Sequence, residues 1–76
     1  MDPWEDARIE AEVKARLAGQ KDANLTRLGV VSRQATVYLS GAVEAPDQKA
    51  LAAALANDVR GVRGVVSTVE VRSATQ

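Results

Sequence analysis

Hydrophobic residues near the beginning of the chain recur every four positions, at Ile9, Val13 and Leu17. This spacing places them on one stripe of a helix, because residues four apart lie one above the other on its surface. Asp2 and Pro3 are typical of a helix start, since aspartate caps free backbone N–H groups and proline suits the first helical position. We therefore predict a helix over about residues 3–18.

Between residues 28 and 43 the hydrophobic period shortens to two, which is typical of strands with one buried face. A polar break over residues 32–35 divides this stretch and predicts a β-hairpin. The primed two-residue turns that are common in hairpins need positive φ angles, which Ala35 resists, so we expect a longer turn or a type I turn. The preceding residues 20–26 are polar and predict a loop, with Leu25 as a candidate core residue.

Pro46 predicts the start of a second helix, and the alanine-rich run that follows it favours helical structure. The expected buried stripe of this helix consists of Ala52, Leu55, Ala56 and Val59. Hydrophobic and polar residues alternate again over residues 65–72, which predicts a third strand. A crossover of this length returns the third strand parallel to the second.

The order of predicted elements is therefore helix, strand, strand, helix, strand. We expect an α+β fold, a small αββαβ sandwich in which two helices pack on one face of a three-stranded mixed β-sheet. A single domain spans residues 1–76, with its core over about residues 6–72 and a frayed tail at residues 73–76. The predicted core residues are Ile9, Val13, Leu17, Leu28, Val30, Val37, Leu39, Leu55, Val59, Val65, Val69 and Val71.

The composition argues against several classes of function. The 76 residues include no cysteine and no histidine, which removes disulfides, the usual zinc ligands and the commonest general base. Ten basic and ten acidic residues cancel, whereas a nucleic-acid-binding domain is expected to be basic. The carboxylates of Asp6 and Glu10 lie one helical turn apart, and we expect them to be solvated or paired with arginine or lysine. We expect no enzymatic activity, no metal, no cofactor and no nucleic acid partner.

The segment RGVRGVV at residues 60–66 carries two glycines beside two arginines. A phosphate-binding loop follows a strand and opens a helix, whereas this segment follows a helix and precedes a strand. We interpret Gly61 as the left-handed residue that ends the second helix. Gly64 is interpreted as a flexible loop position or as a close approach of the hairpin turn, and Gly41 as a further structural turn position.

The predicted strand directions gather charged residues at the two ends of the domain. Arg33 in the hairpin turn, and Arg60 and Arg63 after the second helix, share one end with Trp4. The opposite end carries the basic residues Lys14, Arg16, Lys21 and Arg27. Two interpretations remain open: charges that complement the helix dipole, or a face for anions and lipid headgroups formed by the three arginines, with Trp4 as an interfacial anchor.

Three patterns that follow one another along the chain resemble those of the BON domain family. The residues that carry the resemblance are Asp6, Ile9, Val13 and Leu17 in the first helix, Val37, Leu39, Gly41 and Val43 in the second strand, and Gly61, Val62 and Val65 after the second helix. The resemblance covers about residues 6–72. The chain departs from the family pattern in the hairpin turn, where the family usually has a glycine and this sequence has Gln34 and Ala35.

The resemblance implies a non-catalytic bacterial module, linked to the cell envelope or to osmotic stress, that binds phospholipid surfaces or partner proteins. An anionic phospholipid surface is the first expected partner, and a partner protein or domain is the alternative. For the alternative, exposed strand edges or an outer sheet face with Val31, Tyr38 and Val66 would dock the partner. No membrane span or secretory signal occurs in the sequence as given. We expect a soluble protein, periplasmic or envelope-associated if this is a mature or excised form, and cytoplasmic otherwise.

Overall fold

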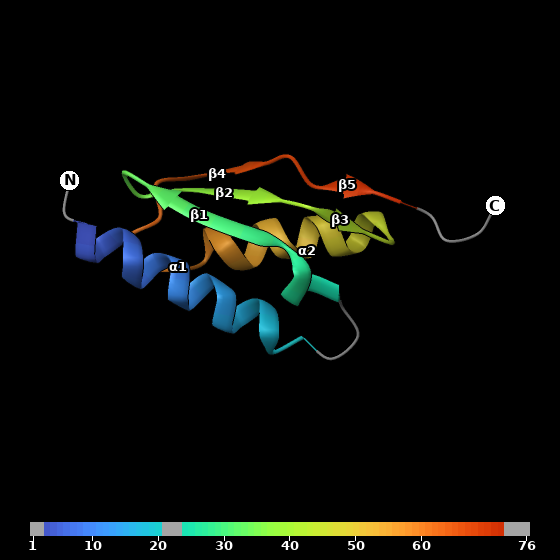
Figure 1. The fold of residues 1–76 in the computed structure, drawn as a ribbon, viewed down its shortest axis with the longest axis horizontal. Coiled ribbons are helices and arrows are strands. Elements are labelled where there is room, and N and C mark those ends of the chain that lie inside the picture. The colour runs from blue at the N-terminus through green and yellow to red at the C-terminus, as the bar shows by residue number, and fades with distance from the viewer. Residues whose placement is uncertain (1–2, 21–23, 73–76) are drawn as a thin grey trace.

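The computed structural model describes residues 3–20 and 24–72 of the chain. Its elements, in order, are α1 (Pro3–Ala18), a short 3-10 helix η1 (Asn24–Arg27), β1 (Gly29–Arg33), β2 (Thr36–Ser40), β3 (Ala42–Val43), α2 (Pro46–Asn57), β4 (Gly64–Ser67) and β5 (Glu70–Val71). Figure 1 shows the strands as one layer and the two longer helices as a second layer on one face of it. The predicted αββαβ fold is confirmed. The predicted helix cap at Asp2, the basic residue Lys21 and the predicted frayed tail lie outside the described residues.

The main sheet has the strand order β1-β2-β4. β2 runs antiparallel to β1 and parallel to β4, so α2 forms the predicted crossover between two parallel strands. The register pairs Val31 with Tyr38 and Tyr38 with Val66, and these three residues form one row across the sheet. Each of them is 43% exposed, on the face that points away from the helices. We call this side of the sheet the open face.

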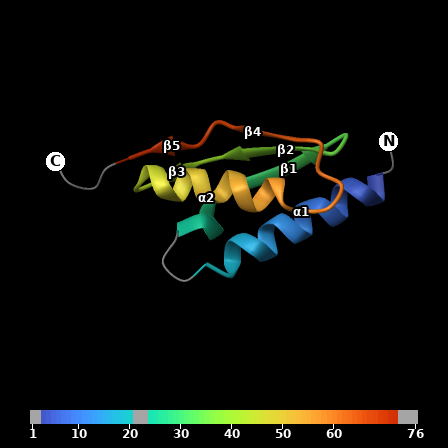
Figure 2. The same cartoon turned by 180° about the vertical axis from the view of Figure 1, so that it is seen from behind.

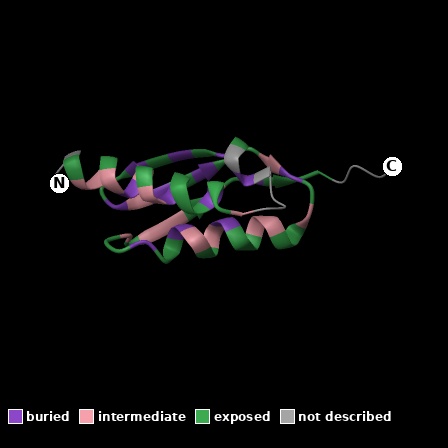
Figure 3. Ribbon diagram, turned by 90° about the horizontal axis from the view of Figure 1, so that it is seen from below, coloured by how far each residue is buried: buried purple, intermediate pink, exposed green. Residues whose placement is uncertain are grey.

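The core fills the space between the helices and the other face of the sheet. The predicted stripe of α1 is buried, and so are the alternate positions of β1 and β2 that face it. Ala52 and Ala56 of α2 are fully buried, and their small side chains let this helix lie close to the strands. Leu25 in η1 is also fully buried, which confirms it as a core residue. The view from behind in Figure 2 shows both helices on the same side of the sheet, and Figure 3 shows exposed residues along their outward sides.

The third predicted strand is interrupted, and so is the second. Gly41, with a φ of 122°, separates β2 from β3, and Thr68 and Val69 separate β4 from β5 at the same level. The pairing continues beyond the interruption, because the Glu70 N–H donates to the Gly41 carbonyl at 2.9 Å and β3 pairs parallel with β5. Val71, in the short final strand at the sheet edge, is 40% exposed, so its assignment to the core is wrong. An edge strand is covered from fewer sides than β2.

Candidate functional site

The hairpin turn between β1 and β2 has an unusual backbone conformation. Arg33 pairs with Thr36, so the turn contains two residues, and these have φ angles of 51° for Gln34 and 66° for Ala35. Positive φ at both positions is the mark of the primed type I turn, and the predicted longer or type I turn is therefore wrong. Such a conformation costs a non-glycine residue about 1–2 kcal/mol, so a compensating interaction is expected.

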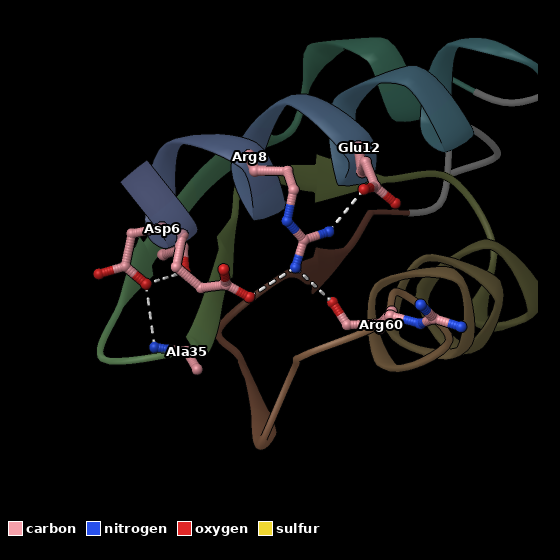
Figure 4. Close-up of polar contacts among 7 residues, drawn as sticks. Asp6, Arg8, Glu12, Ala35 and Arg60 are labelled. Atoms are coloured by element: carbon pink, nitrogen blue, oxygen red, sulfur yellow. Dashed lines mark hydrogen bonds and ion pairs between the residues drawn. The ribbon is translucent and has the colours of Figure 1, made fainter. Parts of the chain in front are cut away.

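Asp6, in the first turn of α1, supplies this compensation. Its Oδ1 accepts hydrogen bonds from the Ala35 N–H at 3.0 Å and from the Ser32 hydroxyl at 2.8 Å, and its Oδ2 accepts one from the Gln34 N–H at 3.0 Å. Figure 4 shows the carboxylate facing the turn. Hydrogen bonds to an ionised acceptor are stronger than neutral ones. The bond from Ala35, and next that from Ser32, hold the pKa of the Asp6 carboxyl below its ordinary value of 3.8.

Glu10 lies one helical turn further along α1 and binds the same strand. Its Oε2 accepts a hydrogen bond from the Ser32 N–H at 2.9 Å. This N–H points outward from the edge strand β1, away from β2. The expectation that Asp6 and Glu10 are solvated or paired with basic side chains is wrong, because groups of the hairpin are their partners. No pattern within the helix alone could indicate this, since the partners lie 22 to 29 residues away in the sequence.

Arg8 ties the same part of α1 to a second loop. Its guanidinium forms ion pairs with Glu5 and Glu12, both at 2.6 Å, and these acids raise the pKa of Arg8. It also donates a hydrogen bond to the carbonyl oxygen of Arg60 at 2.9 Å, as Figure 4 shows. The spacings of three and four residues between these charges are visible in the sequence as helical ion pairs. The contact between Arg8 and the loop before β4 is not visible in the sequence, because it depends on the tertiary fold.

Gly61 lies next to the ion pair of Arg8 and Glu5. It has a φ of 96°, so it has the expected left-handed backbone, although α2 already ends at Asn57 and Gly61 belongs to a following turn. A Cβ at this position would lie 2.9 Å from Arg8 Nη2 and 2.9 Å from Glu5 Oε2. Gly64 differs, because it is the first residue of β4 rather than a loop residue, and a Cβ there would meet no atom within 4 Å.

The structure places the four candidate binding residues at one end of the molecule. Arg33 ends β1 beside the hairpin turn, Arg60 lies in the turn before β4, and the Arg63 N–H donates to the Ala35 carbonyl at 2.8 Å. Trp4 lies in the first turn of α1, and its side chain is 80% exposed. Within residues 3–20 and 24–72 the three arginines form no ion pair, and all are exposed. We call this region, with Trp4, the arginine end.

The opposite end of the domain carries an open apolar cleft of about 610 Å³. Its lining residues are Lys14, Leu17, Ala18, Leu25, Leu28, Gly29, Val30 and Val31. Lys14 is the one charged residue of this lining. Of the basic residues predicted for this end, Lys14 and Arg16 lie on α1 and Arg27 on η1. Arg16 lies 3.8 Å from Asp58 in a loose, exposed ion pair.

Neither a membrane-spanning helix nor a cluster of metal-ligating side chains occurs among the described residues. Both helices are too short or too polar to cross a bilayer, and no three acidic side chains gather at one point in the described ranges. Asp6 and Glu10, which lie one helical turn apart on α1, are engaged by the hairpin. Their carboxylates therefore support the turn and the strand edge.

The family model described as the BON domain matches residues 5–73, which is nearly the whole chain. No curated protein matches the chain.

Proposed function

Because the chain belongs to the BON domain family, we propose that it is a non-catalytic binding module whose arginine end attaches to anionic phospholipid surfaces. We further propose that it acts at a bacterial envelope or in the response to osmotic stress. The observation that carries the proposal is the charge balance at the arginine end. Glu5, Asp6 and Glu12 are bound by groups within the protein, whereas Arg33, Arg60 and Arg63 form no ion pair within the described residues.

The internal pairing explains how a chain with no net charge can present a positive surface. Glu5 and Glu12 share the guanidinium of Arg8, and Asp6 accepts three hydrogen bonds from the hairpin, two of them from the turn and one from Ser32. These carboxylates therefore compete little with an external anion for Arg33, Arg60 and Arg63. Exposed charges separated by more than about 10 Å are also largely screened at 0.1 M salt.

The expected affinity of one domain is low. Each arginine near an anionic membrane surface contributes about 1 kcal/mol, so three arginines increase binding by roughly a hundredfold. Trp4 adds an interfacial anchor, since tryptophan favours the boundary between headgroups and hydrocarbon. We therefore expect stable attachment when several copies are linked or when a second module assists.

Vesicle co-sedimentation tests the proposal. The domain, alone and tethered in several copies, is mixed with vesicles of neutral lipid or with vesicles that also contain an anionic phospholipid. We expect sedimentation only with the anionic lipid, and we expect it to weaken as salt is raised. Changing Arg33, Arg60 and Arg63 to Gln, or Trp4 to Ala, should reduce the bound fraction.

A matched variant at the other end of the domain serves as the control. Changing Lys14, Arg16 and Arg27 to Gln removes the same number of positive charges and should leave binding nearly unchanged. Equal losses in the two triple variants would mean that net charge, not the arginine end, attracts the protein. Failure of the tethered wild type to sediment at low salt would reject the lipid proposal.

The row of residues on the open face favours a second candidate function, that of an adaptor that binds another protein. Val31, Tyr38 and Val66 are paired in register and about half exposed, so they offer a continuous apolar strip to a partner. Co-purification with Tyr38→Ser as the control variant tests this candidate. A partner that is retained by the wild type and by Tyr38→Ser alike does not use the open face.

A further inference from the structure

The two edges of the main sheet are protected to different degrees. At the β1 edge, Glu10 of α1 accepts the outward-facing N–H of Ser32 at 2.9 Å. The other edge is formed by β4, and Figure 1 shows no described element beyond it. An exposed strand edge is a template for pairing with another strand, and proteins usually block it with charges, proline or a covering element.

The backbone of β4 has hydrogen-bonding groups that point away from the sheet. The Thr68 N–H donates to the Leu39 carbonyl, and the Glu70 N–H donates to the Gly41 carbonyl, both at 2.9 Å. Because strand residues alternate in direction, the N–H and C=O groups of Val65 and Ser67 face the opposite, outer side. Within residues 3–20 and 24–72, no hydrogen bond from another element reaches these groups.

The sequence of this edge contains none of the usual protective residues. Residues 64–68 read GVVST, without a charge or a proline. The whole chain has a formal net charge of zero, so two copies do not repel one another at long range. Charged residues occur only beyond the strand, with Arg63 before it and Glu70 after it.

We propose that β4 pairs antiparallel with β4 of a second copy of this chain, about a two-fold axis at Val66, to form one six-stranded sheet. Val65 of each copy then lies opposite Ser67 of the other, so the outward-facing groups of both copies become paired. Val66 lies opposite Val66 of the second copy and extends the row on the open face across both molecules. In the same register Arg63 of each copy lies opposite Val69 of the other and Glu70 lies opposite Val62, so no like charges face each other across the new pairing. This inference does not depend on lipid binding.

Cysteine cross-linking tests the pairing directly, because the natural chain contains no cysteine. Val66→Cys places two thiols opposite each other at a non-hydrogen-bonded antiparallel pair, where the Cα atoms of neighbouring strands lie within disulfide reach. Val31→Cys is the matched control, since Val31 is in the same row, equally exposed, and on the protected edge. We expect mild oxidation to give a disulfide-linked dimer with Val66→Cys and little with Val31→Cys. Equal cross-linking of the two variants would overturn the proposal.

Sedimentation equilibrium over a concentration series gives the second measurement. We expect the wild type to dimerise, Val66→Lys to weaken dimerisation by at least roughly tenfold, and Val31→Lys to leave it nearly unchanged. Circular dichroism checks that each variant is folded. A wild type that stays monomeric at millimolar concentration would overturn the proposal. An equal effect of the two lysines would also overturn it, since that result indicates packing between open faces.

Discussion

Asp6 sets the conformation of a turn that is 28 residues away in the sequence. The side chains of Gln34 and Ala35 give no reason for positive φ angles, and the turn is formed because a carboxylate on α1 accepts both of their N–H groups. The sequence of the turn alone therefore points to the wrong turn type. Asp6 does belong to the pattern that resembles the BON family. The sequence therefore singled out this residue, but it did not show that Asp6 binds the hairpin turn.

The pH dependence of stability tests this role of Asp6. Its folded pKa lies below the ordinary value of 3.8, so its contribution is complete above that pH and is lost as the pH falls through the lower folded pKa. We expect Asp6→Asn to lower the unfolding midpoint at neutral pH and to flatten the loss of stability in acid. Thermal unfolding from pH 7 downward measures both effects. Glu44→Gln, at an exposed glutamate, is the control and should retain the acid profile of the wild type.

The two glycines of the RGVRG segment should respond oppositely to alanine. Gly61→Ala forces a positive φ on alanine and crowds the ion pair of Arg8 and Glu5, so we expect a loss of at least about 1–2 kcal/mol in unfolding free energy. Gly64→Ala adds a methyl group in open space within a strand, and we expect no loss and a gain of up to about 1 kcal/mol. Denaturant unfolding of both variants measures the difference. A costly Gly64→Ala would show that other atoms pack against the first residue of β4.

At the scale of elements, the hydrophobic period was enough to predict α1 and the strands, and Pro46 with the alanine-rich run after it predicted α2. The four-residue spacing of α1 and the two-residue spacing of β1 and β2 are each produced by contact with a single core, so local pattern and tertiary packing agree. The interruption at Thr68 and Val69 could not be predicted, because the alternation of Val65, Ser67 and Val69 continues through it. The interruption lies beside Gly41, where the paired chain has a positive φ angle. The residues of the third strand do not show that the chain paired with them is interrupted at this point.

The close contact between α2 and the sheet leads to a prediction about alanine size. Ala56 is fully buried, whereas Ala54 on the same helix is exposed. We expect Ala56→Leu to cost about 1–3 kcal/mol, because a larger side chain must displace the helix or its neighbours. Ala54→Leu should change stability little. Unfolding in urea compares them, and a tolerated Ala56→Leu would mean that α2 can move away from the strands without loss.

As a whole molecule, the domain depends on a core of few and medium-sized side chains. Leu39 is almost completely buried in the central strand, and Leu39→Ala should cost about 2–5 kcal/mol. Domains of this kind are stable by only about 5–15 kcal/mol, and a small one lies near the lower limit. We therefore expect Leu39→Ala to be largely unfolded at 37 °C. Circular dichroism tests this, and Tyr38→Ala on the open face, as the exposed neighbour, should remain folded.

The hairpin turn held by Asp6 also has a consequence for the order of folding. A β-hairpin normally forms within microseconds and can begin the folding of a domain, because its contacts are local. Here the hairpin must bring two residues into an unfavourable conformation, and the compensating carboxylate arrives only when α1 docks. The transition state should therefore already contain the contact between helix and hairpin, and Asp6→Asn should slow refolding more than it speeds unfolding. In this chain the folding nucleus then consists of α1 packed against the β1–β2 hairpin, and α2 and β4 pack onto it afterwards.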